Sequence, residues 1–375
     1  MPMETVLKKP LLSMCDLLDS QRIPVTAKDR VKGSYPYYGA NGVQDYVDKY
    51  IFDDELVLLA EDGGNFGSKD RPIAYRVSGK CWVNNHAHVL KPHDDIDVDY
   101  LCYSLMFYNT NGLVNGATRQ KLTQASMKLM QIPVPAIILQ KEIVTKLKNI
   151  EHVIELRKTQ LQKLDELVKS RFIEMFGDPN SKLGKYSQQA LESICSKIND
   201  GEHGSVPRIE KGIIFLNAKN IKKNGTIDWE QVTYIDEVIH NRIYKRCNPE
   251  PGDILLTTTG TIGNACIVPC VEQFSMDRGI TLVKPNHKIV DSIFLITLLR
   301  SQYLQSCMNQ NIHASAIGHL FLNKVKKLPV FVPPIDLQNE FADFVKSIDK
   351  SKLAIQKSLD DLETLKKSLM QQYFG

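Results

Sequence analysis

Apolar residues recur in alternating steps of four and three along residues 139–177, with charged residues between them. The same steps recur in the same order along residues 337–375. This spacing is typical of a coiled-coil seam, which is narrower than the apolar stripe of a helix on a globular core. The sequence predicts two long helices, and their seams consist of Ile143, Leu147, Ile150, Ile154, Leu161, Leu164, Val168, Phe341, Val345, Ile348, Ile355, Leu359, Leu362 and Leu369.

Four basic residues interrupt these seams at Arg157, Arg171, Lys352 and Lys366. One interpretation is that their aliphatic stems lie along the interface while the charges reach water. The other is that they help to fix an antiparallel register, as polar seam positions do in coiled coils. The sequence leaves both interpretations open.

The two helical stretches are copies of each other, 198 positions apart. Gln140 and Gly177 of the first copy fall on Gln338 and Gly375 of the second. Two matched seams in one chain most simply pack against each other, and the alternative is that each seam binds a separate partner.

The remainder of the chain is typical of two strand-rich domains with a related plan. Short apolar runs at residues 56–60 and 252–256 indicate buried strands, and a glycine-rich turn follows each run. We therefore expect an α+β (mixed α/β) fold with two homologous domains at residues 1–135 and 179–334. The long helices are expected at residues 136–178 and 335–375.

The order of these parts predicts how the helices run. Each domain is followed by a helix, and the end of the first helix leads into the second domain. If that domain is compact, the second helix begins near the end of the first, so the packed helices are antiparallel. We expect one domain at each end of the helix pair and approximate two-fold symmetry.

Composition narrows the class of protein only slightly. The formal net charge is +4, which permits nucleic-acid binding without arguing for it. No apolar run approaches the length of a membrane span, and residues 1–10 lack the build of a secretion signal, so we expect a cytoplasmic protein. The eight cysteines are scattered and, apart from Cys266 and Cys270, widely spaced, which favours reduced thiols over a metal site.

Motifs for catalysis are missing from the sequence. We find no phosphate-binding loop, no dinucleotide fingerprint, no adenine-methylation motif and no zinc-protease motif. Two related modules at a fixed separation suit an extended ligand that carries two different marks, and DNA is the natural candidate. The pattern favours a binding role over catalysis.

At this point the chain resembles a known family, the DNA-specificity subunits of type I restriction–modification systems. No single motif carries the resemblance; it lies in the order of several segments within a plan that occurs twice. The segments are residues 33–42, 58–67, 84–88, 175–179, 252–263 and 328–330.

The resemblance implies a subunit without a catalytic site of its own. Its first domain would recognise one half of an interrupted, asymmetric DNA target, and its second domain would recognise the other half. The helices would set the length of the spacer between the halves. They would also recruit two methyltransferase (modification) subunits that methylate adenine N6.

The resemblance also implies where the cofactors lie. No cofactor or metal is expected in this chain, whereas S-adenosylmethionine, ATP and Mg²⁺ are expected on partner subunits. Those partners are the methyltransferase subunits and restriction subunits with translocase activity, acting on double-stranded DNA. No membrane is involved.

Candidate DNA contacts come from the polar segments around the predicted strands. They are Asn65, Lys69, Arg71, Arg76, Asn85, His86, Arg119, Lys121, Lys219, Asn220, Lys222, Lys223, Thr259, Arg278, His313 and Ser315. Amides and cations of this kind contact base edges and phosphates in protein–DNA complexes. For most of them the simpler interpretation is a solvated surface.

Three of these segments have specific alternatives. His86 and His88 suggest a metal site, but the sequence offers no evident third ligand, so a structural or DNA-facing role is favoured. Asn84 and Asn85 either contact adenine edges or form a turn. Arg278 either makes an internal ion pair or contacts a base.

Two rival functions remain. The chain could be a single-chain nuclease or methyltransferase with this recognition part, although the motifs for either are absent. It could also be a coiled-coil scaffold with two protein-binding lobes and no role with DNA.

Overall fold

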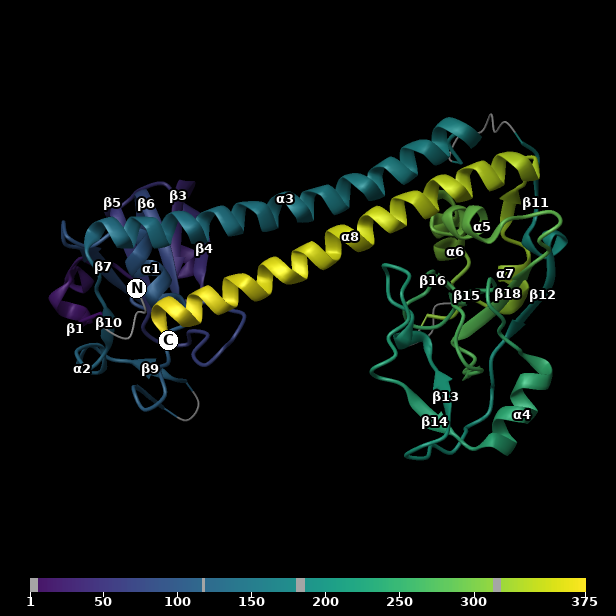
Figure 1. The fold of residues 1–375 in the computed structure, drawn as a ribbon, viewed down its shortest axis with the longest axis horizontal. Helices are drawn as coiled ribbons and strands as arrows, with labels where there is room; N and C mark the ends of the chain where they lie inside the picture. Colours follow the sequence, from purple (N-terminus) through teal and green to yellow (C-terminus); the bar gives the residue numbers. More distant parts are fainter. Residues whose placement is uncertain (1–5, 117–118, 180–185, 313–317) are drawn as a thin grey trace. The chain divides into compact units, whose positions relative to one another are not determined.

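The computed structural model describes residues 6–116, 119–179, 186–312 and 318–375. They form two compact units, the first made of residues 1–160 and 355–375 and the second of residues 161–354. Each unit contains one strand-rich domain together with part of each long helix (Figure 1). Among the described residues, no helix combines the length and apolar character that crossing a membrane requires.

The first domain is built on a six-stranded sheet with the strand order β2-β7-β5-β6-β3-β4. Its central strand β5 ends in the predicted apolar run, and residues 56–60 are completely buried. The elements of this domain are β1 (Lys8–Pro10), β2 (Cys15–Leu17), β3 (Lys32–Gly39), β4 (Gly42–Val47), β5 (Phe52–Ala60), β6 (Ala74–Val83), β7 (Ala87–Pro92), α1 (Val98–Met106), β8 (Val114–Asn115), β9 (Lys121–Leu122), α2 (Gln124–Met127) and β10 (Gln131–Pro133).

The second domain has a four-stranded sheet, β12-β18-β15-β16, and a three-stranded sheet, β14-β13-β17. The short strand β11 pairs with β19, which comes just before the last long helix. In the first domain β1 pairs with β10, which comes just before the first long helix. The elements are β11 (Gln188–Ala190), β12 (Cys195–Asp200), β13 (Ile213–Leu216), β14 (Thr233–Ile235), α4 (Glu237–Arg246), β15 (Ile254–Thr257), β16 (Ala265–Ile267), β17 (Ser275–Met276), β18 (Ile280–Pro285), α5 (Ser292–Leu299), α6 (Gln302–Gln310), α7 (Leu322–Lys326) and β19 (Pro329–Phe331).

Strand register shows that the two domains share a common frame. In the first domain β5 pairs with β7 so that Val57 faces Leu90. In the second domain β15 pairs with β18 so that Ile254 faces Val283. In both cases the first strand of the sheet, β2 or β12, lies on the other side of the same partner strand. The predicted α+β fold class with two related domains is confirmed.

The two long helices are α3 (Ile137–Phe176) and α8 (Ile335–Phe374). In the first unit, residues near the start of α3, such as Ile143 and Leu147, belong to one apolar cluster with Leu369 and Tyr373 near the end of α8. In the second unit the end of α3 meets the start of α8, where Phe172 lies 5.4 Å from Phe341 between ring centroids. The helices are therefore antiparallel within each unit, as predicted.

The residues predicted for the seam are all buried or half-buried. Three of the basic residues that interrupt the seams pair with acids on the opposite helix. Arg171 lies 2.8 Å from Glu340, Lys352 lies 2.5 Å from Asp165, and Lys366 lies 2.8 Å from Glu151. These pairs connect the two helices, as the interpretation based on antiparallel register expects.

Gln140, near the start of α3, is a completely buried polar residue. Its Nε2 donates to the carbonyls of Asp95 at 3.1 Å and Pro135 at 2.9 Å. Its Oε1 accepts from the N–H of Asp97 at 2.8 Å. Because Asp97 is the N-cap of α1, one side chain joins the start of the long helix to the start of the domain's own helix.

Gln338 repeats this arrangement at the start of α8. It donates to the carbonyls of Ile289 at 3.1 Å and Pro333 at 2.7 Å, and it accepts from the N–H of Asp291 at 2.9 Å. Asp291 is the N-cap of α5. The internal sequence repeat at this position thus corresponds to the same three hydrogen bonds in both units.

Replacing Gln338 by methionine is expected to lower the free energy of unfolding of the second unit by about 2–4 kcal/mol, since two carbonyls and one N–H become buried without partners. Chemical denaturation followed by circular dichroism measures this loss. The control is Asn339→Met at the neighbouring exposed position. Equal denaturation midpoints for the two variants would contradict a role for the buried amide in holding the helix start.

Candidate nucleic-acid interface

In the first domain, three segments meet where strand β5 ends. The N–H of Glu61 donates to the carbonyl of His86 at 2.9 Å, just before β7. The carbonyl of Glu61 accepts from the N–H of Leu122 at 2.7 Å, in β9. These backbone bonds bring together the turn after β5, the residues before β7 and the segment around residue 121.

The second domain makes the same backbone bonds at the end of β15. The N–H of Thr258 donates to the carbonyl of Gly279 at 2.8 Å, and its carbonyl accepts from the N–H of Leu320, also at 2.8 Å. Each domain therefore presents an equivalent set of loops at the same end of its sheet. The chemistry of the two sets differs, because the side chains on this shared backbone differ.

In the first domain these loops carry a group of charged side chains, which we call the first-domain cluster. It consists of Asp19, Arg22, Glu61, Asp62, His86, His88, Arg119 and Lys121. The acids Glu61 and Asp62 come from the turn after β5. Their basic partners Lys121 and Arg119 come from the segment around β9, about sixty residues later in the chain.

The outer part of the cluster is centred on two carboxylates. Oδ1 of Asp62 lies 2.7 Å from Nδ1 of His86 and 2.7 Å from Nη2 of Arg119. Oε1 of Glu61 lies 2.9 Å from Nζ of Lys121. The Arg119 and Lys121 side chains are 58% and 49% exposed, so both cations can reach a ligand in solvent without leaving their loops.

The inner part is buried and centred on His88, whose side chain is 1% exposed. Its Nδ1 lies 2.6 Å from Oδ2 of Asp19, and its Nε2 lies 2.8 Å from the carbonyl of Leu122. Burial by itself would raise the pKa of the Asp19 carboxyl, but the hydrogen bond and charge of His88, the N–H of Val89 and the charge of Arg22 hold that pKa below its ordinary value. Both ring nitrogens of His88 therefore have a hydrogen-bonding partner inside the domain.

Asp19, Glu61 and His88 also form the kind of group that can hold a metal ion, because their ligand atoms lie within 4.8 Å of one another. The sequence showed no third ligand beside the two histidines, and the structure supplies these two carboxylates. However, Arg22 already binds both acids, with Nη1 2.6 Å from Glu61 and Nη2 3.2 Å from Asp19. A divalent cation would have to compete with this guanidinium, so the geometry fits an ion-pair network better than a metal centre.

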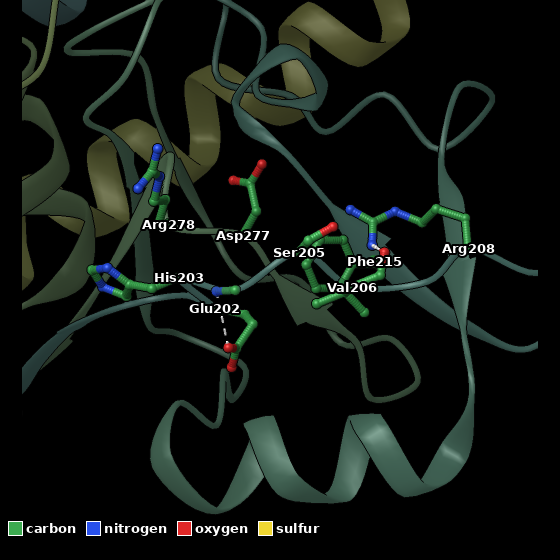
Figure 2. Close-up of a pocket in the computed structure, with 9 residues that line it drawn as sticks. Glu202, His203, Ser205, Val206, Arg208, Phe215, Asp277 and Arg278 are labelled. Carbon is green, nitrogen blue, oxygen red and sulfur yellow. Dashed lines mark hydrogen bonds between the residues drawn. The ribbon is translucent and has the colours of Figure 1, made fainter.

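In the second domain, the turn before β18 and the segment after β12 border a hollow of about 330 Å³, which we call the second-domain pocket (Figure 2). Its lining is mostly polar and consists of Glu202, His203, Gly204, Ser205, Val206, Arg208, Phe215, Asp277 and Arg278. The Arg208 guanidinium lies over the Phe215 ring at 4.1 Å, and its Nη1 donates to the carbonyl of Val206 at 2.6 Å. Figure 2 shows Asp277 between the two arginines.

Comparison with known proteins identifies the family. The family described as type I restriction modification DNA specificity domain matches residues 3–166 and, separately, residues 198–364. The chain belongs to this family. It is a DNA-specificity protein, and the two matches correspond to its two specificity domains.

Curated relatives carry the same description. A putative type I restriction enzyme specificity subunit of Haemophilus influenzae is 27% identical over 353 residues, which span 91% of this chain and 87% of that protein. The type I restriction enzyme MjaVIII specificity subunit of Methanocaldococcus jannaschii is 21% identical over 377 residues, spanning 92% of this chain and 86% of its own length.

Solved structures show the same fold. The type I restriction–modification S subunit from M. genitalium superposes with a TM-score of 0.61 at 16% identity, covering 100% of this chain and 99% of that one. A chain from a study of complex assembly and conformational transition in the type I system gives a TM-score of 0.56 at 14% identity, covering 96% and 97%.

In the first specificity domain the structure brings together only some of the predicted contacts. His86, Arg119 and Lys121 lie in the first-domain cluster, and the side chain of Asn85 is exposed next to them. Lys69 and Arg71 are exposed on the loop that follows the turn after β5.

Asn65 and Arg76, two further predicted contacts, are both bonded within the domain. The Asn65 amide donates to the carbonyl of Pro72 at 3.4 Å, within its own loop. Arg76 forms ion pairs with Glu55 and Asp99, so its guanidinium joins β5 and β6 to the start of α1. Arg76 stays a predicted contact whose guanidinium is paired inside the domain in this structure.

In the second specificity domain, Arg278 lies in the pocket and makes no ion pair with any described residue. Thr259 lies at the end of β15, where its Oγ1 is 2.7 Å from Nδ1 of His319. Lys219 and Lys223 are exposed, whereas Lys222 pairs with Asp228 at 2.8 Å. The predicted contacts His313 and Ser315 lie outside the described residues.

Asn220, another predicted contact, has a buried side chain, and its amide is used within its own loop. It donates to the carbonyls of Asp228 at 3.3 Å and Gln231 at 3.0 Å, and it accepts from the N–H of Asn217 at 2.9 Å. A polar loop after a buried strand suggested exposure, but here the asparagine holds the loop together.

Sequence reasoning missed Asp19, Arg22 and Asp277 as parts of these sites. One signal was present, because an acid is followed three residues later by a basic residue at Asp19–Arg22 and again at Asp200–His203. Asp200 is also the counterpart of Asp19 in the sheet, since it accepts from Oγ1 of Thr281 at 2.6 Å as Asp19 binds His88.

Asp19→Asn is expected to lower the free energy of unfolding at pH 7 by about 2–4 kcal/mol, because it removes the buried carboxylate that His88 and Arg22 both bind. The folded-state pKa of Asp19 lies below its unfolded value of about 3.9, so the stabilisation is full above that pH and is lost as pH falls through the folded pKa. The gap between wild type and variant should therefore narrow below about pH 4, measured by urea denaturation across pH.

Asp16→Asn provides the matched control, since the Asp16 side chain is 67% exposed and its one ion pair among the described residues, with His93, is also exposed. It should change stability by less than about 0.5 kcal/mol at every pH. A gap for Asp19→Asn that stays constant down to pH 2 would contradict the lowered pKa of Asp19.

Proposed function

We propose that this chain is the subunit that recognises a two-part, asymmetric DNA target, with one half of the target recognised by each specificity domain. The proposal rests on one observation: the loops of the two domains have the same backbone arrangement and carry different side chains. Both domains present equivalent loops held by the same hydrogen bonds at Glu61 and Thr258. Two domains that share a loop backbone and differ in their side chains suit a target whose halves differ in sequence.

The differences lie at equivalent positions around the strand ends. Strand pairing places His88 opposite Leu59 and Thr281 opposite Leu256, so a buried imidazole in one domain corresponds to a buried hydroxyl in the other. Likewise, Lys121 corresponds to His319, which follows from the matching bridges to Asp62 and Thr259. Lys121 and His319 are not buried, and side chains that differ in charge and in donor pattern select different bases.

Phosphate binding in this proposal falls to exposed cations rather than to a strongly basic surface. In the first domain, Arg119 and Lys121 are paired with Asp62 and Glu61 in the absence of DNA. Half-exposed ion pairs of this type are weak, so a phosphate can replace the carboxylate at small cost. We expect binding to weaken with salt, since phosphate contacts release counterions.

The long helices would hold the methyltransferase subunits. These partners would supply S-adenosylmethionine and the catalytic pocket for adenine N6, while restriction subunits would supply ATP- and Mg²⁺-dependent steps. The target adenine has to leave the base stack to be methylated. The role of this chain is to position the partner subunits at one DNA sequence, and it catalyses no step itself.

Co-expression with the adenine methyltransferase encoded beside this chain is expected to give a stable complex that marks one interrupted, two-part motif. Single-molecule sequencing of genomic DNA methylated by the complex provides the measurement. The chain alone should incorporate no labelled methyl group. Methyl transfer by the isolated chain would support the enzyme alternative, and a lack of both complex and DNA binding at low salt would support the protein scaffold.

Inserting one heptad into both long helices, after Gln160 and after Ala354, is expected to lengthen the unspecified gap in the DNA target. Seven residues add roughly 10 Å to a helix, which corresponds to about three base pairs. A heptad in each helix preserves the seam pattern. The methylated motif of the variant complex gives the gap directly, and an unchanged gap would contradict a measuring role for the helices.

The matched control for this insertion changes one helix only. A heptad after Gln160 alone offsets the seam of α3 against α8, so it should destabilise the complex instead of lengthening the gap. The comparison separates a change in length from simple damage to the helix pair.

A further inference from the structure

Asp277 occupies the same structural position in the second domain as Asn84 does in the first. Oδ1 of Asp277 accepts from the N–H of Gly279 at 2.9 Å, and Oδ1 of Asn84 accepts from the N–H of His86 at 2.8 Å. In both domains this turn leads directly into the strand that pairs with β5 or β15. The two side chains are held at the same place by the same bond.

Their remaining polar atoms differ. Nδ2 of Asn84 donates to Oε1 of Gln44 at 3.1 Å, and the asparagine is only 3% exposed. Asp277 is half-buried, and its Oδ2 has no hydrogen-bond partner among the described residues. Burial raises the pKa of Asp277, and the N–H of Gly279 and the charges of Arg208 and Arg278 act in the opposite direction. The protein thus leaves one acceptor unused at the wall of an open pocket.

The surroundings of this acceptor define what it can bind. An apolar ligand is disfavoured because the lining of the second-domain pocket is largely polar or charged. Arg208 and Arg278 flank Asp277 (Figure 2), and guanidinium groups bind guanine edges and phosphates. A carboxylate between two such groups needs a ligand that offers a donor next to acceptors or negative charge. The edge of a DNA base pair in the major groove offers that combination.

We propose that Asp277 is a specificity-determining residue whose free carboxylate oxygen accepts a hydrogen bond from the exocyclic amino group of a cytosine or adenine. That base lies in the half of the target that the second domain recognises. The assignment rests on the proposed function, and it deepens it by naming a residue and a base chemistry. Cytosine N4 and adenine N6 are the amino donors of the major groove, whereas guanine O6 and thymine O4 would repel a carboxylate.

The first test is the methylated motif of the complex with Asp277→Ala. Removing the acceptor is expected to relax one position in the second half of the motif, with discrimination against the wrong base falling about 10-fold. The first half of the motif should stay intact, which a general loss of folding would not permit. Glu272→Gln, an exposed neutralising change in the same domain, should leave both halves unchanged. A motif unaltered in both halves by Asp277→Ala would overturn the assignment.

The second test does not depend on whether the variant folds. Wild-type complex is bound to target DNA in which one exocyclic amino group at a time is deleted, with purine in place of adenine or 2-pyrimidinone in place of cytosine. One probe in the second half should bind about 10-fold more weakly to wild type. If Asp277→Ala is stable, that probe and the natural target should bind it equally. Uniform binding of all second-half probes by wild type would overturn the assignment.

These outcomes separate the assignment from the function on which it rests. If wild-type complex marks no two-part motif, the proposed function itself fails. If wild type marks such a motif and the second half is insensitive to both Asp277 and the amino groups, only the assignment fails. Asp277→Asn then serves to name the base, because an asparagine amide still pairs with adenine but loses the preference for cytosine.

Discussion

Two buried glutamine amides fix where the long helices leave their domains. Gln140 and Gln338 each satisfy two carbonyls and one N–H that would otherwise be buried without partners. One of the carbonyls belongs to the proline-containing segment before the helix, and the N–H belongs to the N-cap of the domain's own helix. Because an unpaired buried polar group is costly, this geometry has few alternatives. The direction of each helix relative to its own domain follows from it.

The two domains combine a common backbone with different recognition chemistry. Hydrogen bonds between backbone groups hold the loops at the ends of β5 and β15, so the loops keep their places while side chains change. In the first domain these side chains form a nearly closed ion network around His88 and Asp19. In the second domain the turn before β18 instead borders an open pocket, with an unused acceptor at Asp277. Separating scaffold from side chain in this way allows each half of a DNA target to be specified independently.

The charged side chains of the first domain hold one another in position more than they attract the DNA backbone. The net charge of the chain is only +4, and most cations around the strand ends already have acidic partners. Buried pairs such as Asp19 with His88 hold their loops in one geometry, whereas the exposed pairs can exchange partners. Binding energy would then come from a few positioned groups, which is how base selection differs from general affinity for phosphates.

The sequence alone determined the helices, the repeat and the class of fold. Heptad spacing and short apolar runs are local patterns, so they can be recognised in a sequence without knowledge of distant contacts. The family resemblance likewise depended on the order of segments along the chain. Gln140 and Gln338 could be matched by the repeat, although their three hydrogen bonds could not be read from it.

Only the tertiary structure decided which polar residues are free to bind. Asn220 and Arg76 looked like surface contacts, but their partners lie within folded loops or on neighbouring elements. Asp19 and His88 are 69 positions apart, and strand pairing alone brings them together. Whether a polar side chain is used internally depends on these distant partners, and no local pattern records them. For that reason the fold could be predicted from the sequence, whereas the recognition surface could not.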